Sequence, residues 1–405
     1  MQKPNIIYIH SHDTGRYIEP YGHAIPTPNI QQLAEEGVLF RQAFCANPTC
    51  SPSRASLLTG QWAHSCGMGG LVNRGWSLPH PERLLPRVLS EAGYQTVRAG
   101  MQHVVKDPQE GGYERILEDG ERAEERAAAF LGEEHQRPFF LDVGFSATHR
   151  KGRGFDPPPE GETPTDPRYV RPPAPLSDAE ETREDMALYI DAARTLDQQM
   201  GRVFTALDEH GLREDTLVIC TPDHGIAFPL MKCHLTDHGM GVMLIVRGPG
   251  GFAGGQVIDG LVSHIDLFPT ICELARIDKP DWLQGISLRP LVDGEQAEVR
   301  EEVFAEVNYH VCYEPQRAVR TQRWKYIRRL HERARPVLPD CDDSISKDFL
   351  IALSWREREE AEELLYDLAC DPHETCNLAK EEAHAAVLAE MRERLARWRR
   401  DTDDP

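Results

Sequence analysis

The sequence of 405 residues lacks any long hydrophobic run. A helix that crosses a membrane needs roughly 20 mainly apolar residues, and because no segment approaches that length we expect no membrane-spanning helix. The first apolar run, Asn5 to His10, is also too short for a signal peptide. The sequence therefore predicts a cytoplasmic protein that does not insert into a membrane.

Positive charge is scarce as well. The 45 Lys and Arg residues are outnumbered by 66 Asp and Glu residues, which gives a formal net charge of -21 at pH 7. Because such a chain repels polyanions, we expect neither nucleic acid nor an anionic membrane surface as a partner. A negatively charged substrate would need a local positive pocket.

Closely spaced cysteine pairs are missing too. The ten cysteines include no Cys-x-x-Cys motif, and they are too dispersed for the disulfide framework of a small secreted protein. We therefore expect most of them to be buried, reduced thiols.

Short apolar runs alternate with helical patterns over the first two thirds of the chain. Continuous β-branched and aromatic runs indicate strands that are covered on both faces, and their alternation with helices indicates a mostly parallel sheet. The predicted fold is therefore α/β, with helices on both faces of a central sheet. We expect strands at 5–10, 94–100, 137–145 and 215–225, and helices at 83–93 and from about 178 to 210.

Polar residues follow directly after three of these strands. In parallel sheets the carboxyl ends of the strands meet at one edge, where ligands bind. The polar residues at the strand ends are His12, Asp13, His149, Arg150, Asp223 and His224.

A proline-rich segment, 156–175, cannot form a helix because of its prolines. It either connects elements over the surface or forms a wall of the active site.

The pattern changes after about Asp293. Alternating polar and apolar residues at 301–310, 316–322 and 323–330 indicate antiparallel strands, and a charged helix ends near residue 400. We therefore expect a catalytic domain at 1–295 and a smaller α+β domain with an antiparallel sheet at 296–405.

The stretch Cys50 to Gly60, "CSPSRASLLTG", has the signals of a short helix. Pro52 suits the first turn and Gly60 the C-terminal side, so Cys50 would lie at the N-terminal end. The free N–H groups there attract anions and would favour a thiolate or a bound sulfate or phosphate, with Arg54 adding positive charge. Alternatively, Cys50 is only a small buried apolar residue.

The pattern C-x-P-S-R-x-x-x-x-T-G resembles the signature of type I sulfatases of the alkaline phosphatase superfamily. In that family a formylglycine-generating enzyme converts the cysteine into formylglycine, an aldehyde. The blocks "PNIIYIHSHDTG", "TPNIQQLAEEGVLFRQAF", "DTLVICTPDHG" and "LLYDLACDPHETCNLA" are similar to blocks of the family in the same order. The last block looks closest to the heparan N-sulfatase branch.

This resemblance implies hydrolysis of a sulfate ester or a sulfamate. One hydroxyl of the hydrated aldehyde attacks sulfur, and deprotonation of the other expels sulfate, which a cysteine cannot do because it has no second hydroxyl. A divalent cation, usually Ca²⁺, neutralises the sulfate oxygens. The positions that match its ligands are His12, Asp13, Asp223, His224 and the modified Cys50.

Two positions depart from the family. His12 stands where the family usually has an aspartate, and because imidazole suits Mn²⁺ or Zn²⁺ better than Ca²⁺, the identity of the metal stays open. In an alternative interpretation His12 does not bind the metal itself but donates a hydrogen bond to the residues that do, which leaves Asp13, Asp223 and the modified Cys50 as ligands. Met101 replaces a lysine that would contact the modified cysteine, so the pocket loses one positive charge.

The resemblance also implies roles for side chains around the cysteine. Lys232 matches a residue that binds the sulfate and the leaving oxygen. His149 matches a residue that contacts or protonates the leaving group, and His103 matches a histidine that acts on the modified cysteine. With Cys50 and Arg54 these form the predicted catalytic set. Lys232 and Arg150 are expected to bind substrate.

Three functions are compatible with these residues. The first is hydrolysis of sulfate groups on an anionic small molecule or oligosaccharide. The second is a phosphonate monoester or phosphodiester hydrolase of the same superfamily, and the third is an unmodified, non-catalytic protein that binds an anion or a metal. Groups for the nucleophile and for the leaving group occur together, which favours an enzyme.

Overall fold

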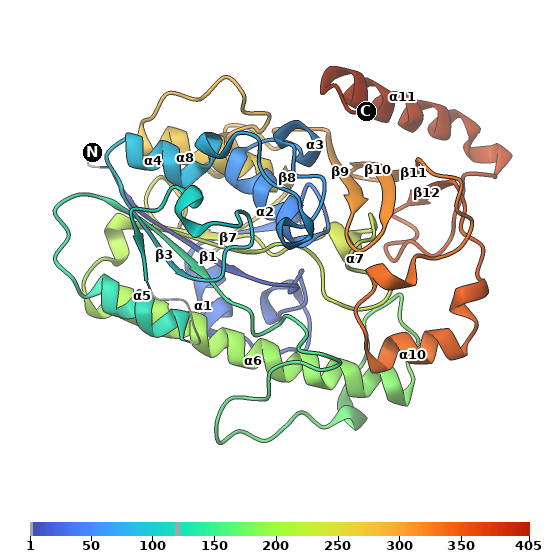
Figure 1. Cartoon of the computed structure of the whole chain (residues 1–405), viewed down its shortest axis with the longest axis horizontal. Coiled ribbons are helices and arrows are strands. Elements are labelled where there is room, and N and C mark those ends of the chain that lie inside the picture. The colour runs from blue at the N-terminus through green and yellow to red at the C-terminus, as the bar shows by residue number, and fades with distance from the viewer. Residues whose placement is uncertain (1–2, 118–121) are drawn as a thin grey trace.

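The computed structural model describes residues 3–117 and 122–405, and an eight-stranded sheet forms its centre (Figure 1). The strand order is β4-β3-β5-β1-β6-β7-β2-β8, and every neighbouring pair is parallel except the two that β7 makes with β6 and β2. The strands are β1 Asn5–Ser11, β2 Val38–Phe44, β3 Gln95–Gly100, β4 Arg115–Ile116, β5 Phe139–Gly144, β6 Thr216–Pro222, β7 Ile245–Arg247 and β8 Gln256–Ser263.

Helices cover both faces of this sheet (Figure 1). Because successive side chains of a strand point to opposite faces, β1 places Ile6 and Tyr8 in one apolar cluster and Ile7 and Ile9 in another. The first cluster faces α2 Cys50–Thr59, α4 Leu85–Glu91 and α8 Leu267–Ala275, and the second faces α1 Pro28–Glu36, α5 Ala123–Leu131 and α6 Glu180–Glu209. The prediction of an α/β fold with both faces covered is confirmed.

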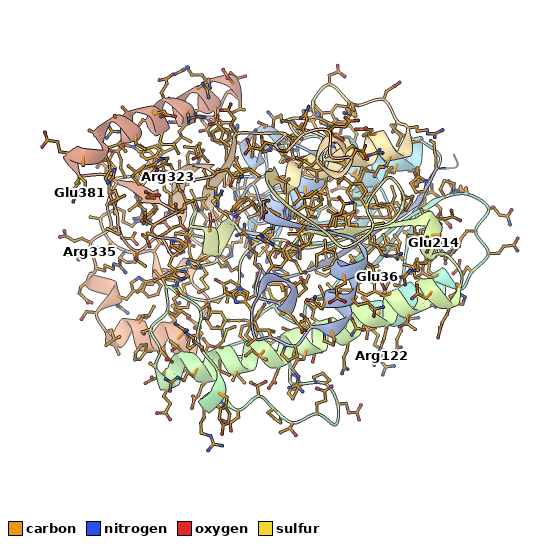
Figure 2. The ribbon with its side chains drawn as sticks, turned by 180° about the vertical axis from the view of Figure 1, so that it is seen from behind. Glu36, Arg122, Glu214, Arg323, Arg335 and Glu381 are labelled. Carbon is orange, nitrogen blue, oxygen red and sulfur yellow. The ribbon has the colours of Figure 1, made fainter. Side chains whose placement is uncertain are left out.

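A second, antiparallel sheet of four strands lies beside the first, in the order β12-β11-β10-β9. The chain leaves the large sheet at Ser263 and enters the small one at Glu302, an interval that contains the predicted domain boundary. Figure 2 shows both parts from behind, with Glu36, Arg122 and Glu214 labelled on the large-sheet part and Arg323, Arg335 and Glu381 on the small-sheet part. The elements are β9 Glu302–Tyr309, β10 Tyr313–Thr321, β11 Trp324–Arg329, α10 Ile345–Ala352, β12 Glu363–Asp367 and α11 Ala385–Asp401.

The proline-rich segment mostly follows the surface of α6. The backbone N–H of Thr165 donates to Asp191 at 3.0 Å, and Arg194 forms an ion pair with Glu162. Over this stretch the structure has one short 3-10 turn, Pro167–Tyr169, and otherwise no regular element. The segment is therefore chiefly a connector, although Asp156 lines a cavity of about 1200 Å³.

Two expectations from composition can be compared with the structure. All ten cysteines are free and seven are buried, as predicted. Among the described residues, none of the helices combines the length and the apolar character that crossing a membrane requires. The cellular compartment and the domain boundary at 295/296 stay predictions.

An aromatic cluster holds the two sheets together. The ring of Trp62 lies 5.4 Å from that of Trp398 on α11, which stacks on Phe304 of β9 at 4.9 Å. Beside it, the His64 ring bonds to a Glu306 carboxylate oxygen at 2.7 Å and to the carbonyl of Thr402 at 3.2 Å. Because neither partner can donate, both ring nitrogens must carry a proton. Burial opposes this charge, yet the bond to Glu306 raises the pKa of His64.

His64 should therefore stabilise the junction in a pH-dependent way. Its raised pKa means that the stabilisation is complete below the ordinary histidine pKa and is lost as the pH rises through the folded value. We expect His64→Gln to lower the free energy of unfolding by about 2 kcal/mol at about pH 5.5 and by less at about pH 9. Urea unfolding at both pH values measures this, with the exposed His80→Gln as control. An equal loss at both values would contradict the assignment.

Candidate active site

Four neighbouring parallel strands end at the same edge of the large sheet. They are β3, β5, β1 and β6, in that spatial order. The register pairs His10 of β1 with Gly144 of β5 and with Thr221 of β6, so the residues that follow these strands emerge side by side. The prediction that the polar strand ends share one edge is confirmed. The side chains delivered there are His103, His149, His12, Asp13, Asp223 and His224.

Two of these residues have an uncommon backbone conformation. Asp13 has φ 52° and His103 has φ 60°, in the left-handed region that non-glycine residues seldom adopt. Such conformations cost free energy and persist where the surrounding structure imposes them, which is common at functional sites.

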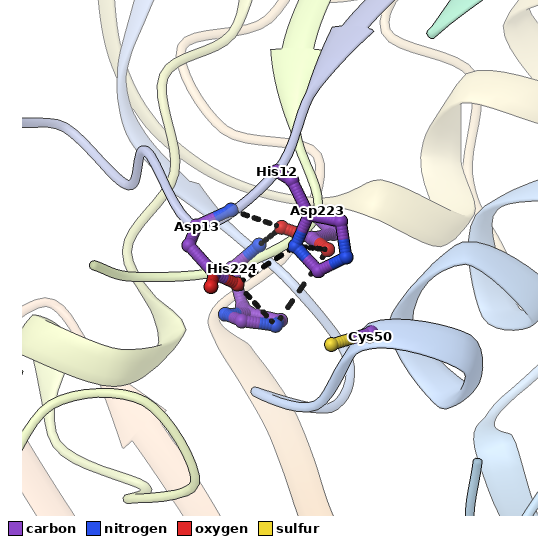
Figure 3. A group of neighbouring side chains, drawn as sticks. All are labelled: His12, Asp13, Cys50, Asp223 and His224. Carbon is purple, nitrogen blue, oxygen red and sulfur yellow. Dashed lines mark hydrogen bonds and ion pairs between the residues drawn. The ribbon is translucent and has the colours of Figure 1, made fainter. Parts of the chain in front are cut away.

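Five predicted ligands form one buried group (Figure 3). One ligand atom from each of His12, Asp13, Cys50, Asp223 and His224 lies within 4.8 Å of all the others. His12 Nδ1 is 2.9 Å from a carboxylate oxygen of Asp13 and 3.2 Å from one of Asp223. Burial lowers the pKa of His12 to about 3, so the imidazole is neutral and able to act as a ligand.

The orientation of His224 fits a cation at this place. Its Nδ1 lies 3.0 Å from the backbone carbonyl of Gly225, which can only accept, so the ring proton is on Nδ1. In the neutral ring the lone pair of Nε2 faces Asp13 at 3.3 Å and Asp223 at 3.6 Å. Nε2 is buried and has no hydrogen-bond partner in the described part of the chain. A lone pair aimed at two carboxylates is repulsive, and a shared metal ion would remove the repulsion.

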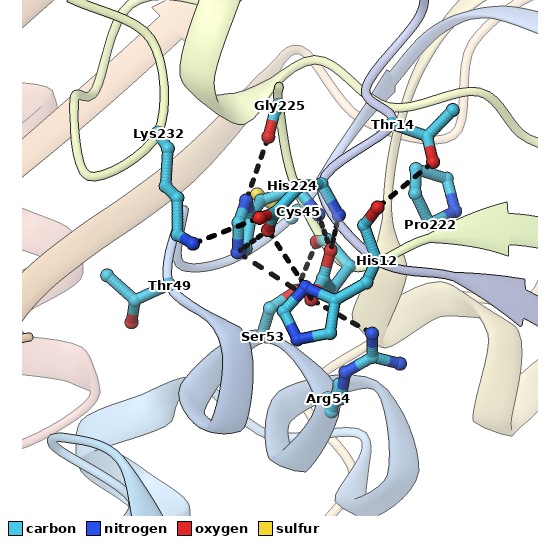
Figure 4. A network of polar contacts seen from close by, with 12 residues as sticks. His12, Thr14, Cys45, Thr49, Ser53, Arg54, Pro222, His224, Gly225 and Lys232 are labelled. Atoms are coloured by element: carbon cyan, nitrogen blue, oxygen red, sulfur yellow. Dashed lines mark hydrogen bonds and ion pairs between the residues drawn. The ribbon is translucent and has the colours of Figure 1, made fainter. Parts of the chain in front are cut away.

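Two cations flank the carboxylates (Figure 4). Lys232 Nζ lies 3.0 Å from Asp13, and Arg54 Nη2 lies 2.9 Å from Asp223. Burial would raise the pKa of each carboxyl, but Lys232 holds that of Asp13 well below its usual range and Arg54 lowers that of Asp223. Both aspartates are therefore ionised, as metal ligands must be.

Arg54 is itself held by a chain of buried groups that the sequence analysis did not find. Its Nη1 donates to His10 Nδ1 at 2.6 Å, and His10 Nε2 is 2.8 Å from Asp142, which also accepts from Tyr113. Because a guanidinium only donates, the His10 proton must be on Nε2. His10 lies two residues before His12, and the alternation along a strand is a signal that could have identified it.

Cys50 begins α2, as predicted, and Gly60 ends it with φ 66°. All ten residues of the helix are buried. The expected thiolate is wrong for the unmodified side chain, since burial raises the pKa of Cys50. An unmodified Cys50 would be a protonated thiol beside two carboxylates. A protonated thiol is a poor nucleophile.

His149 and His103 lie on the open side of the group. The ring of His12 is 4.3 Å from that of His149 and 6.0 Å from that of His103. His149 Nδ1 bonds to the carbonyl of Arg150 at 2.8 Å, so its proton is on Nδ1 and Nε2 is free to exchange one. Burial and then the charge of Arg54 lower the pKa of His103 to about 4.

Arg150 does not lie where a substrate-binding residue should. Its guanidinium forms two bonds with Asp185, at 2.8 and 2.9 Å, and its Nε donates to the carbonyl of Ala227 at 2.7 Å. It also packs 4.3 Å from the ring of Phe155 and 4.7 Å from that of Phe228. The prediction for Arg150 is therefore corrected: this arginine ties the loop after β5 to α6.

Two further residues were missed because they come from the small-sheet part of the chain. Asp342 lies 3.0 Å from Lys232 Nζ. His310 is buried near the same lysine, and burial followed by the charge of Lys232 lowers its pKa to about 3. Their distance in sequence from the other site residues leaves no local pattern that would have pointed to them.

A cavity of about 1200 Å³ opens beside His103. Met101, which replaces the expected lysine, lines it together with Trp76. The charged residues that line it are four basic ones, Arg98, Lys106, Arg122 and Lys151, and two acidic ones, Glu124 and Asp156. On a chain with net charge -21 this is a local excess of positive charge, which attracts anions.

Comparison with known proteins adds sequence relatives. Human N-sulphoglucosamine sulphohydrolase is 32% identical, and the alignment covers 94% of this chain and 87% of that protein. A delta 4,5-hexuronate-2-O-sulfatase of Bacteroides thetaiotaomicron is 26% identical over 96% of this chain and 88% of its own length. A solved structure, the phosphonate monoester hydrolase of Agrobacterium radiobacter, has the same fold with TM-score 0.76, 21% identity and coverage of 98% and 96%.

Two family models match the sequence. Residues 230–343 match the model described as N-sulphoglucosamine sulphohydrolase, C-terminal, and residues 4–277 match the model described as Sulfatase. The second match covers more than half of the chain and includes every strand of the large sheet. The protein therefore belongs to the sulfatase family.

Proposed function

We propose that this sulfatase hydrolyses sulfate ester or sulfamate groups on an anionic carbohydrate, with Cys50 converted to formylglycine and one divalent cation bound beside it. The observation that carries the proposal is the buried group of Cys50, two ionised aspartates and the unpartnered Nε2 of His224, all within 4.8 Å. A formylglycine-generating enzyme is then required as a partner during maturation.

Each side chain of the site has a role in this proposal. The cation would be held by five residues: Asp13, Asp223, His224, His12 and the modified Cys50. Its positive charge would offset the negative charge of the sulfate oxygens. Lys232 adds a second positive charge at the transferred group. Arg54 acts through Asp223 by fixing its carboxylate. His149 Nε2 is placed to donate a proton to the leaving oxygen or nitrogen.

The positive cavity beside His103 supports an anionic sugar as substrate. Indole rings are common stacking surfaces for apolar faces, and Trp76 is 37% exposed at this cavity. The similarity to human N-sulphoglucosamine sulphohydrolase favours N-sulfated glucosamine among such sugars. The likeness to the phosphonate monoester hydrolase concerns the fold alone, so that activity is the alternative to exclude.

The experiment that tests the function compares kcat/KM on an aryl sulfate, an aryl phosphodiester and N-sulfated glucosamine. We expect the sulfated compounds to be hydrolysed faster than the phosphodiester, and N-sulfated glucosamine to be a substrate. A clear preference for the phosphodiester would replace the proposal with the phosphonate and phosphodiester alternative.

The modification of Cys50 can be tested by mass spectrometry of protein made together with a modifying enzyme. The peptide that carries position 50 should contain an aldehyde in place of the thiol, in proportion to the activity of the same sample. Cys45 is buried close by but lies outside the signature, so it should stay a thiol and serves as an internal control. Full activity from protein with unmodified Cys50 would contradict this mechanism.

Lys232 and His149 should respond differently to the leaving group. Lys232→Ala removes charge stabilisation that every substrate needs, so we expect kcat/KM to fall about 100-fold or more on all of them. His149→Ala removes a proton donor, so the loss should be at least about 100-fold on a sulfated sugar and small on a nitrophenyl sulfate. Equal losses for His149→Ala on both substrates would leave His149 as a positioning residue only.

The choice of metal can be tested at His12. His12→Asp should shift the preference toward Ca²⁺ over Mn²⁺ or Zn²⁺, because carboxylate oxygen suits Ca²⁺ better than imidazole does. His12→Gln is the control, since it removes the imidazole without adding a charge. Competition between the metals, followed by elemental analysis, measures the preference. An unchanged ratio in His12→Asp would place His12 outside the ligand set.

A further inference from the structure

A second cavity, of about 350 Å³, is lined by residues from both sheet-bearing parts of the chain. Arg16 and Tyr17, which follow Asp13 along the chain, line it together with His238 of α7 Asp237–Met240. Arg320 of β10 and His373 line it as well. His373 belongs to the block "LLYDLACDPHETCNLA", which contributes no residue to the candidate active site.

Two arginines line this cavity, Arg16 and Arg320. Their guanidinium carbons lie 4.5 Å (Arg16) and 4.8 Å (Arg320) from the centroid of one ring, that of Phe44. Of the described residues that line the cavity, Asp237 is the one acid, and it also pairs with Lys325 at 2.5 Å. With Lys325 and its other partner, Glu374, included, three cations face two carboxylates. The surroundings are therefore positive on a strongly acidic chain.

Three buried polar atoms around the cavity have no hydrogen-bond partner in the described part of the chain. They are Nε of Arg16, Nε of Arg320 and Nε2 of His238. Arg320 is 3% exposed, so its Nε–H is not compensated by bulk water. His238 Nδ1 already bonds to the hydroxyl of Tyr17 at 2.9 Å. Buried donors are almost always paired, and an oxyanion would supply the missing acceptors.

Gly241 makes room for this arrangement. A Cβ atom at position 241 would lie 2.5 Å from the backbone carbonyl oxygen of Asp237, 2.8 Å from the guanidinium carbon of Arg16 and 2.9 Å from its Nε. Any other residue would collide with the backbone of Asp237 as well as with the Arg16 guanidinium. Position 241 thus leaves room for the partly buried Arg16, which forms no ion pair with the residues that the structure describes and whose Nη2 donates to the carbonyl of Ala43 at 2.8 Å.

We propose that this cavity binds the tetrahedral oxyanion of a sulfate or phosphate group between Arg16 and Arg320, with His238 Nε2 as a third contact. The site is separate from the candidate active site and does not depend on the proposed function. It adjoins the metal-binding loops through the backbone, because Gly225 N–H donates to the carbonyl of Gly239 at 2.8 Å. The oxyanion is either a free inorganic anion or a substituent on a sugar.

The test is calorimetric titration of inorganic sulfate and inorganic phosphate into the full chain carrying Lys232→Ala, which weakens anion binding at the candidate active site. We expect one remaining anion per chain. Adding Arg320→Gln or Arg16→Gln should weaken this binding at least tenfold. Adding Arg323→Gln, a change of a nearby arginine that pairs with Asp367 at 2.7 Å and lies outside the cavity, should not.

Several outcomes decide the matter. Absence of anion binding in the Lys232→Ala protein, or binding that neither Arg16→Gln nor Arg320→Gln changes, would overturn the proposal. If Arg320→Gln does not fold, His238→Gln replaces it, with an expected loss of about threefold or more. Titration with glucosamine 6-sulfate separates the two sources: tighter binding than inorganic sulfate identifies a sugar substituent, and equal or weaker binding identifies the free anion.

Discussion

The structure depends on two carboxylates that are buried beside one another at the ends of adjacent strands. Asp13 is 0% exposed and Asp223 is 1% exposed, and the backbone N–H of Asp13 donates to Asp223 at 2.9 Å. Ionised groups in such a place must be compensated by positive charge. Lys232 and Arg54 supply part of it from the flanks, and the lone pair of His224 points to a cation at the centre. The register of β1 and β6, the position of α2 and the left-handed conformation of Asp13 together place these charged groups next to one another.

The sequence predicts those parts of the site that follow from strand alternation and from one motif. Apolar runs locate β1, β3, β5 and β6, and their parallel arrangement brings Asp13 and Asp223 together. The pattern is weaker for β7, which has three residues, and for β8, whose first residues are largely exposed at the sheet edge. Arg150 shows the limit of the approach, because its place after β5 suggested substrate binding while its actual partner, Asp185, lies on α6.

The small-sheet part contributes side chains to the surroundings of the large-sheet residues. The small-sheet part supplies Asp342 and His310 to the surroundings of Lys232, and it closes the second cavity with Arg320 and His373. These contacts join segments more than 70 residues apart, so no local period or motif could have predicted them. The junction is reinforced by Trp62, Phe304 and Trp398, which explains why residues of both parts belong to one apolar cluster.

The central claim is that Asp13 and Asp223 are the core of a site for one divalent cation. The most direct measurement is calorimetric titration of metal-free protein with Ca²⁺, Mn²⁺ and Zn²⁺, for the wild type, for Asp223→Asn and for the control Asp259→Asn, which changes an exposed aspartate on β8. The account predicts one ion per chain in the wild type and in Asp259→Asn, and loss of binding in a folded Asp223→Asn. Full occupancy in Asp223→Asn, or no binding of any of the three ions to the wild type, would contradict it.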